Sequence, residues 1–355
     1  MRFTVQKKAF EKVLGKAAAT VDHGKALPVL RGVLLEVLHD VLAVTAYDLE
    51  VAYEAALDVT EPTPGKALVD AGKLSTIVRS LPEGAVRIEA TKNRLVVSSG
   101  SVEFKLAVLN PADYPEVPTA GENGVEVSAK QLNSALTGVI YAASTDATRY
   151  SLNGVFLQAE GEVAVAVATD GHRLAKVEVP WNGPSVFGSI LPRKAVSIMR
   201  SILEGVDGSV ALTVKDRIVT LIVGDESVSL RLIDGQFPRW QEVIPSSDQQ
   251  QGTLTVDRRK LLEVLKRVSI VGSSAKVDLG ELKVSTVDAD LGEAKEALPG
   301  DYQGLPIVFG INAAYVREAL GAMTAETVTL NVWDDVSPLV VKGSDEIALV
   351  MPMRT

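Results

Sequence analysis

The sequence predicts an α+β fold of three similar domains, each with two helices on antiparallel sheets. Two observations favour this fold class: a strand–helix pattern that recurs three times, and short alternating segments between the helices. A third is the length of 355 residues, which exceeds what one hydrophobic core usually serves. We expect domains at 1–122, 124–247 and 252–355, with polar linkers at 119–124 and 246–252.

The first repeated pattern is an alternating strand followed directly by an amphipathic helix. It starts at Phe3 (FTVQKKAFEKVL), at Val125 (VEVSAKQLNSAL) and at Leu254 (LTVDRRKLLEVL), with spacings of 122 and 129 residues. In each copy, apolar residues first alternate and then recur at helical spacing. A fixed period of this kind indicates one structural unit used several times.

A second pattern recurs half a unit later, from Ala67, Ser189 and Phe309, as a strand end, a capped start and a helix. Between the helices lie alternating segments such as VRIEA, VALTV and IVTLIV, separated by Gly, Asn or Asp turns. Such segments predict hairpin-rich antiparallel sheets, with about eight strands in each domain. The alternative is chance similarity, but two independent patterns at the same period argue against it.

Composition excludes several kinds of site. The chain has no Cys and only three His, which rules out disulfides, thiol nucleophiles and cysteine-ligated zinc or iron–sulfur sites. Phosphate-binding glycine motifs, GxSxG and HExxH are all absent, so we expect no cofactor and no catalytic residue. The acidic stretches 334–335 and 287–293 could bind a divalent ion, but their surroundings predict hairpin turns, and we expect no metal.

The sequence also bears on location. It contains no run of eighteen apolar residues, and its first residues lack the apolar core of a signal peptide. We therefore expect a cytoplasmic protein, associated with the nucleoid, that has no membrane partner.

The charges are distributed unevenly along the chain, whose net charge is −9. Six helical windows (6–20, 67–81, 128–143, 192–204, 257–271 and 312–323) hold sixteen Lys and Arg against six Asp and Glu. The remainder holds twenty basic and thirty-nine acidic residues. Solvated helices alone would carry abundant Glu as well, so the pattern favours an electropositive helical surface suited to phosphate backbones.

The most polar short motif is VATDGHRLAKV, residues 167–177. Asp-Gly between two alternating strands is a strong hairpin signal. Turn chemistry explains Asp170 and Gly171 but leaves His172, Arg173 and Leu174 unexplained. A metal-dependent or hydrolytic enzyme using Asp170, His172 and Arg173 is one alternative, although the chain supplies no further His cluster, Cys or nucleophile motif.

The segment ATDGHRLA (168–175) resembles the hallmark motif of the bacterial β sliding clamps, the processivity factors of DNA polymerase III. The resemblance covers the whole chain, through MRFTVQKKAFEKVL, LPVLRGVLLEV, RYSLNGV, LIDGQFPRWQEVIP and the terminal VMPMR. It implies a non-catalytic, head-to-tail homodimer whose six domains encircle duplex DNA without reading its sequence. The implied partners are the replicative polymerase, the clamp loader and other clamp-motif replication and repair proteins. A clamp-like protein with other partners, encoded by a phage or mobile element, is a further alternative.

The resemblance also implies three groups of site residues. The peptide-binding pocket would use Leu152, Thr169, Gly171, His172, Arg173, Leu174, Pro238, Val243, Asn312, Tyr315, Val336, Pro338, Met351, Pro352, Met353 and Arg354. DNA would be contacted by Lys12, Lys25, Lys73, Arg79, Arg149, Tyr150, Arg193 and Lys194. The dimer interface would use Phe104, Ile270 and Val271. The chain departs from the family at Gly24 and Ser151, where a basic and an aromatic residue are expected.

Overall fold

Antiparallel pairing joins every pair of neighbouring strands that the structure describes, as the alternating segments predict. The computed structural model describes residues 1–21, 24, 27–118, 121, 124–146, 148–183 and 185–354. Their contacts form two compact units: Met1–Lys130 with Lys194–Leu232, and Gln131–Arg193 with Ile233–Thr355. The middle repeat therefore contributes to both units, and each unit is described separately below.

The first unit contains two sheets. The five-stranded sheet has the order β5 (Thr60–Thr63), β1 (Arg2–Gln6), β7 (Ala85–Ala90), β8 (Arg94–Ser99) and β9 (Val102–Ala107). The eight-stranded sheet has the order β10 (Val125–Ser128), β15 (Ser209–Lys215), β16 (Ile218–Val223), β17 (Glu226–Arg231), β4 (Val51–Asp58), β3 (Val41–Tyr47), β2 (Gly32–Leu38) and β6 (Gly65–Asp70). Pairing of β17 with β4 makes the strands of two sequence repeats one continuous sheet.

The second unit also contains two sheets. The nine-stranded sheet has the order β14 (Val186–Pro192), β11 (Gly154–Glu160), β12 (Val163–Thr169), β13 (Arg173–Pro180), β26 (Glu346–Val350), β25 (Leu339–Lys342), β24 (Thr327–Val332), β18 (Gly252–Asp257) and β22 (Asp301–Gly304). The four-stranded sheet has the order β21 (Gly292–Ala297), β20 (Lys283–Asp288), β19 (Ser274–Asp278) and β23 (Val308–Asn312). Here β13 pairs with β26, and two repeats again share one sheet.

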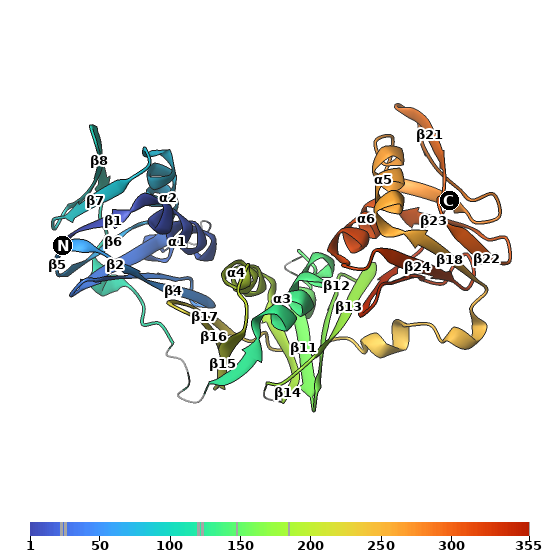
Figure 1. Ribbon diagram of the computed structural model, residues 1–355, viewed down its shortest axis with the longest axis horizontal. Helices are drawn as coiled ribbons and strands as arrows, with labels where there is room; N and C mark the ends of the chain where they lie inside the picture. Colours follow the sequence, from blue (N-terminus) through green and yellow to red (C-terminus); the bar gives the residue numbers. More distant parts are fainter. Residues whose placement is uncertain are drawn as a thin grey trace. The chain divides into compact units, whose positions relative to one another are not determined.

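The helices fall where both repeated patterns place them. They are α1 (Lys7–Thr20), α2 (Ala71–Ser80), α3 (Ala129–Thr137), α4 (Arg193–Leu203), α5 (Arg258–Val268) and α6 (Ala313–Ala322). Six short 3-10 turns occur at η1 (Pro28–Arg31), η2 (Pro111–Asp113), η3 (Ile140–Ala142), η4 (Tyr150–Leu152), η5 (Trp240–Val243) and η6 (Ser247–Gln249) of the described chain. Helices α1 and α2 pack side by side, as do α5 and α6 (Figure 1). The prediction of two helices and about eight strands per repeat is confirmed.

Three of these helices begin at a capping residue that also ends a strand. The carboxylate of Asp70 accepts a hydrogen bond from the backbone N–H of Lys73, and that of Asp257 accepts one from Lys260, both in the first helical turn. Asn312 does the same for Ala314 at the start of α6. A side-chain acceptor at this position satisfies a backbone donor that the helix itself leaves unpaired. In these three places the last residue of the strand therefore also stabilises the first turn of the following helix.

The apolar helix positions face the sheets. In the C-terminal repeat, Leu261, Val264 and Leu265 of α5 are buried with Val316 and Leu320 of α6 in one hydrophobic cluster. Burial of such side chains stabilises the fold by roughly 1.5–3 kcal/mol each. None of the helices in the described chain is long and apolar enough to cross a membrane.

Candidate functional site

The turn between β12 and β13 is built by the side chains of Thr169 and Asp170. The Asp170 carboxylate accepts hydrogen bonds from the backbone N–H groups of His172 (2.9 Å) and Arg173 (3.1 Å). The Thr169 hydroxyl donates to the carbonyl oxygen of Arg173 (2.6 Å) and accepts from the N–H of Gly171 (3.1 Å). Gly171 has φ = +89°, a conformation that favours glycine. The prediction that Asp170 and Gly171 serve the turn is confirmed.

Arg173 points into the protein, although it follows a hairpin turn. Its guanidinium donates to Asp170 (3.0 Å) and to Glu318 of α6 (2.7 Å). It also lies over the rings of Tyr141 and Tyr315, at 5.6 and 4.4 Å from the ring centroids. Its side chain is only 11% exposed, and two carboxylates and two aromatic rings interact with the guanidinium in place of solvent water. Arg173 therefore joins the hairpin turn to α6.

The C-terminal segment 351–354 contacts two different elements of the second unit. The N–H of Met351 donates to the carbonyl oxygen of His172 (2.9 Å), and the N–H of Met353 donates to that of Gly310 in β23 (2.8 Å). A hollow of about 540 Å³ lies along this segment. Its lining residues are Val308, Phe309, Gly310, Asp335, Val336, Met351, Pro352, Met353 and Arg354.

The side chains along this hollow are unusually exposed for apolar residues. Val336 is 71% exposed, Met351 44% and Met353 39%. Thioether side chains adapt to irregular apolar partners, and proline fixes the backbone between them. The hollow therefore offers exposed apolar side chains next to two charged ones, Asp335 and Arg354.

An apolar cluster extends beneath the hairpin that carries His172. The predicted pocket residue Leu174 is buried in this cluster, and Leu152 of η4 packs against it. Of the residues near η5, Val243 is 50% exposed and Pro238 is exposed as well. Sequence reasoning missed several members of the cluster or of its partly buried margin: Phe156, Phe237, Trp240, Ile244, Trp333, Val340 and Leu349. The aromatic residues of the FPRW segment were the available signal for Phe237 and Trp240.

Three of the remaining predicted pocket residues do not line the hollow along segment 351–354. Asn312 caps α6, and Tyr315 lies under the Arg173 guanidinium. Pro338 is partly buried just before β25. The structure therefore divides the predicted pocket residues: Val336 and the segment 351–354 line this hollow, while His172 and Arg173 line a second one at the hairpin turn.

A second, polar hollow of about 510 Å³ borders the same hairpin turn. It is lined by His172 and Arg173 together with two predicted DNA contacts, Arg149 and Arg193. Arg149 donates a hydrogen bond to the carbonyl oxygen of Asp170 (2.6 Å). Arg149 thus buttresses the turn, and in this unit the predicted DNA and pocket residues adjoin one another.

In the first unit, a hollow of about 670 Å³ lies between α1, α2 and α4. It brings together three predicted DNA contacts, Lys12, Arg79 and Lys194. Five other polar lining residues were not predicted from the sequence: Lys8, Glu11, Lys16, Ser197 and Ser201. Lys8, Lys12 and Lys16 are four residues apart on one helix face, which was the signal available for them.

The basic side chains of this hollow differ in whether they already pair with a carboxylate. Lys16 is bonded to Glu226, and Lys194 to the buried Asp48, both at 2.5 Å. Lys8 and Lys12 are exposed and have no ion-pair partner in the part of the chain that the structure describes. Arg79 is 69% exposed, with the carboxylate of Glu11 at 3.9 Å. Lys8, Lys12 and Arg79 are therefore available to an anionic ligand.

The other predicted contacts stand apart from this hollow. Lys73 is exposed on α2 but does not line it, and Tyr150 is 57% exposed in η4 of the second unit. Lys25 lies outside the described residues.

Of the predicted interface residues, Phe104 lies on β9, which is the edge strand of the five-stranded sheet. Ile270, 77% exposed, and Val271 follow α5 directly.

The acidic stretches behave as turns. The carboxylate of Asp334 accepts hydrogen bonds from the N–H groups of Val336 and Ser337, and the bonds from Ser337 hold its pKa below the usual range. Asp288 accepts in the same way from Asp290 and Leu291. Within the described ranges, no three His, Asp or Glu side chains gather as metal ligands would.

Comparison with known proteins gives one consistent result. Models of the N-terminal, central and C-terminal domains of the DNA polymerase III beta subunit match residues 1–118, 126–239 and 241–354. The beta sliding clamps of Pseudomonas putida and Escherichia coli K12 are each 31% identical over the whole of both chains. The crystal structure of the Thermotoga maritima beta subunit has a TM-score of 0.90 at 25% identity, covering 100% of this chain and 99% of that one.

Two of the similar structures are bound to griselimycin. The sliding clamp of Pseudomonas aeruginosa bound to griselimycin has a TM-score of 0.88 at 30% identity, with full coverage of both chains. That of Bartonella birtlesii, also bound to griselimycin, has a TM-score of 0.89 at 28% identity, again over both full chains.

Proposed function

The chain belongs to the family of DNA polymerase III beta subunits, the β sliding clamps. On this premise we propose which of its surfaces bind partner proteins, face DNA and form the dimer. It is a DNA sliding clamp, a non-catalytic processivity subunit that acts with the polymerase on DNA. The alternative of an enzyme using Asp170, His172 and Arg173 is not supported, because Asp170 and Arg173 are committed to each other and to the turn.

The docking site for partner proteins is the hollow along segment 351–354, with the adjoining hairpin turn of His172. The observation that carries this proposal is the pair of backbone bonds from Met351 and Met353, which fix the segment while leaving its side chains exposed. Short peptides with apolar anchors, presented by the polymerase, the clamp loader and other clamp-motif replication and repair proteins, would bury these side chains. Such anchors dominate affinity in peptide grooves.

Griselimycin is a suitable probe, because it is bound to two similar clamps. Val336→Asp places a charge in the hollow and should weaken griselimycin binding at least tenfold, measured by isothermal titration calorimetry. Val287→Asp is the matched control, because Val287 is equally exposed (73% against 71%) but belongs to β20. Equal affinity of both variants, or unchanged binding after removal of residues 351–355, would contradict the assignment.

The DNA-facing surface of the first unit is the hollow between α1, α2 and α4. Lys8, Lys12 and Arg79 would neutralise phosphates without reading bases, which suits a tether that must slide. In the second unit, Arg149, Arg193 and Tyr150 are the corresponding proposals, and Lys73 adds an exposed charge on α2.

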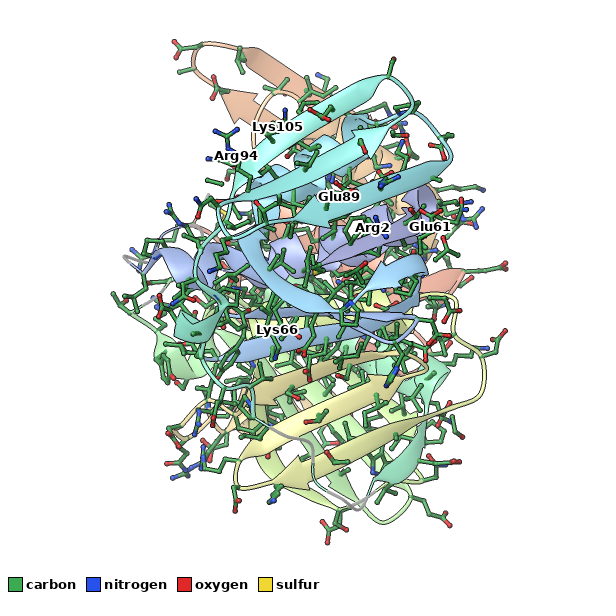
Figure 2. All side chains as sticks on the ribbon, turned by 90° about the vertical axis from the view of Figure 1, so that its left-hand side faces the viewer. Arg2, Glu61, Lys66, Glu89, Arg94 and Lys105 are labelled. Atoms are coloured by element: carbon green, nitrogen blue, oxygen red, sulfur yellow. The ribbon has the colours of Figure 1, made fainter. Side chains whose placement is uncertain are left out.

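Charge reversal tests this surface. The triple variant Lys8→Glu, Lys12→Glu and Arg79→Glu should lose most loading onto nicked circular duplex DNA, because it replaces attraction by repulsion. Lys194 is left unchanged, because its substitution would remove a hydrogen-bonded cation from the buried Asp48. The control variant reverses Lys66, Lys92 and Arg94, giving the same change in net charge. Lys66 on β6 and Arg94 on β8, both labelled in Figure 2, do not line the hollow. Equal loading of the two variants would refute the proposal.

We further propose a cytoplasmic homodimer in which the edge strand β9 of one protomer meets the α5 end of its partner. The exposed Ile270 and the edge position of Phe104 support it. Light scattering should give twice the mass of 37.7 kDa for the wild type and a monomer for Ile270→Asp. Val214→Asp, at a valine 52% exposed on β15, should remain a dimer. A monomeric wild type at physiological concentration would exclude this interface.

A further inference from the structure

A hollow of about 360 Å³ lies on the eight-stranded sheet of the first unit, and none of its lining residues belongs to the docking, DNA-facing or dimer surfaces proposed above. It lies over β3, β4, β16 and β17, where two sequence repeats join. The lining residues are Ala43, Val44, Thr45, Glu54, Ala55, Ala56, Thr220, Ile222, Gly224, Asp225, Glu226, Ser227 and Ser229.

The register of the strands explains why the sheet is hollowed here. Ala43 is opposite Ala56, Thr45 is opposite Glu54, and Glu54 is in turn opposite Ser227. Cross-strand partners point to the same side of a sheet, so short side chains on three neighbouring strands form the floor. Glu54 is the one long polar side chain among these five.

Glu54 differs from the carboxylate next to it. Glu226 also lines the region, but its carboxylate accepts hydrogen bonds from Lys16 (2.5 Å) and from the hydroxyl of Tyr53 (2.7 Å). Glu54 is partly buried, and the described residues offer it no ion pair and no hydrogen bond to its side chain. Burial raises its pKa, which means that the site disfavours the charge it carries at neutral pH.

The neighbourhood of Glu54 leaves its charge uncompensated. Asp225, in the turn between β16 and β17, adds a second negative charge at the rim. Tyr114 lies close by, with its hydroxyl bonded to the carbonyl oxygen of Thr45, and it carries no positive charge. Arg231 is the cation on this side of β17, but it is four residues beyond Ser227, roughly 13 Å along the strand.

We propose that this hollow receives a lysine or arginine side chain from a basic segment of a partner protein. The cation would pair with Glu54, and the hydroxyl of Ser227 would accept a further hydrogen bond. The aliphatic stem would lie against Ala43, Ala56 and Ile222, as long basic side chains do on apolar surfaces. Proteins that bind DNA carry basic segments that contact its phosphates, so partners of this kind can supply the lysine or arginine side chain.

The test uses the full chain with alanine methyl groups labelled for NMR, because Ala43 and Ala56 line the floor. The probe is acetyl-Ala-Ala-Lys-Ala-Ala-amide, and the same peptide with norleucine in place of lysine is its control. We expect the lysine peptide to shift these two methyl signals saturably, and Glu54→Gln to weaken binding roughly tenfold through loss of a charge-assisted bond.

Glu126→Gln is the matched variant, because it removes the same charge from an exposed position on β10 of the same sheet. It should leave the affinity unchanged. Equal affinity of Glu54→Gln and wild type overturns the proposal, as does equal binding of the norleucine peptide. Shifts confined to other alanines would place the peptide elsewhere and overturn it too.

Discussion

The guanidinium carbon of Arg173 lies 4.4 Å from the centroid of the Tyr315 ring, which joins a hairpin turn to a helix 142 residues further along the chain. The same guanidinium also pairs with the partly buried Asp170. Arg173→Met should lower the free energy of unfolding by about 3–5 kcal/mol, because Asp170 loses its cationic partner. Glu318→Gln should cost less than about 1 kcal/mol, since that carboxylate is 49% exposed. Urea denaturation of both variants gives the comparison, and similar losses would show that the Asp170 contact is not the important one.

The second prediction concerns Gly171. Gly171 has φ = +89°, and a Cβ added there would lie 2.9 Å from Nη1 of Arg149. Gly161 has φ = +60° with open space around it, so Gly161→Ala should cost only about 1–2 kcal/mol of backbone strain. Gly171→Ala should cost more and should also weaken griselimycin binding, because the displaced Arg149 supports the turn. Equal thermal midpoints for the two variants would show that Arg149 moves aside without cost.

The third prediction concerns the buried cluster around Glu226. Tyr53→Phe removes one hydrogen bond to a carboxylate and should lower the free energy of unfolding by about 1.5–3 kcal/mol. Lys16→Met leaves the carboxylate without its counter-charge and should cost about 3–5 kcal/mol. Both are measured by urea denaturation. A smaller effect for Lys16→Met than for Tyr53→Phe would reverse this ranking.

The fourth prediction is a dependence of stability on pH. Burial raises the pKa of Glu54 in the folded state above its unfolded value of about 4.3. As the pH falls through the folded pKa, the native state takes up a proton before the unfolded state does, so this residue's contribution to stability improves. Glu54→Gln should therefore be more stable than wild type at pH 7. The difference should shrink as the pH approaches 4, followed by thermal midpoints at each pH, and a constant difference would contradict the buried charge.

The sequence was sufficient to predict the repeated elements, because strand alternation, capping residues and helical spacing are local properties. Lys12, Arg79 and Lys194 were predicted together, and they line one hollow. The direction of Arg173 was not predictable, since its partners Tyr141, Tyr315 and Glu318 are brought to it by tertiary packing. The Glu54 hollow was equally hidden, because it depends on the pairing of β4 with β17.

The pairing of β17 with β4, and of β13 with β26, has a consequence for the middle third of the chain. Cut out at its sequence boundaries, this third would expose the edge of Glu226–Leu230 and that of Arg173–Val177, each with unsatisfied backbone donors and acceptors. Bare strand edges seek any strand they can pair with, including copies of themselves. The middle sequence repeat is thus not a unit of autonomous folding, and the isolated segment is expected to aggregate.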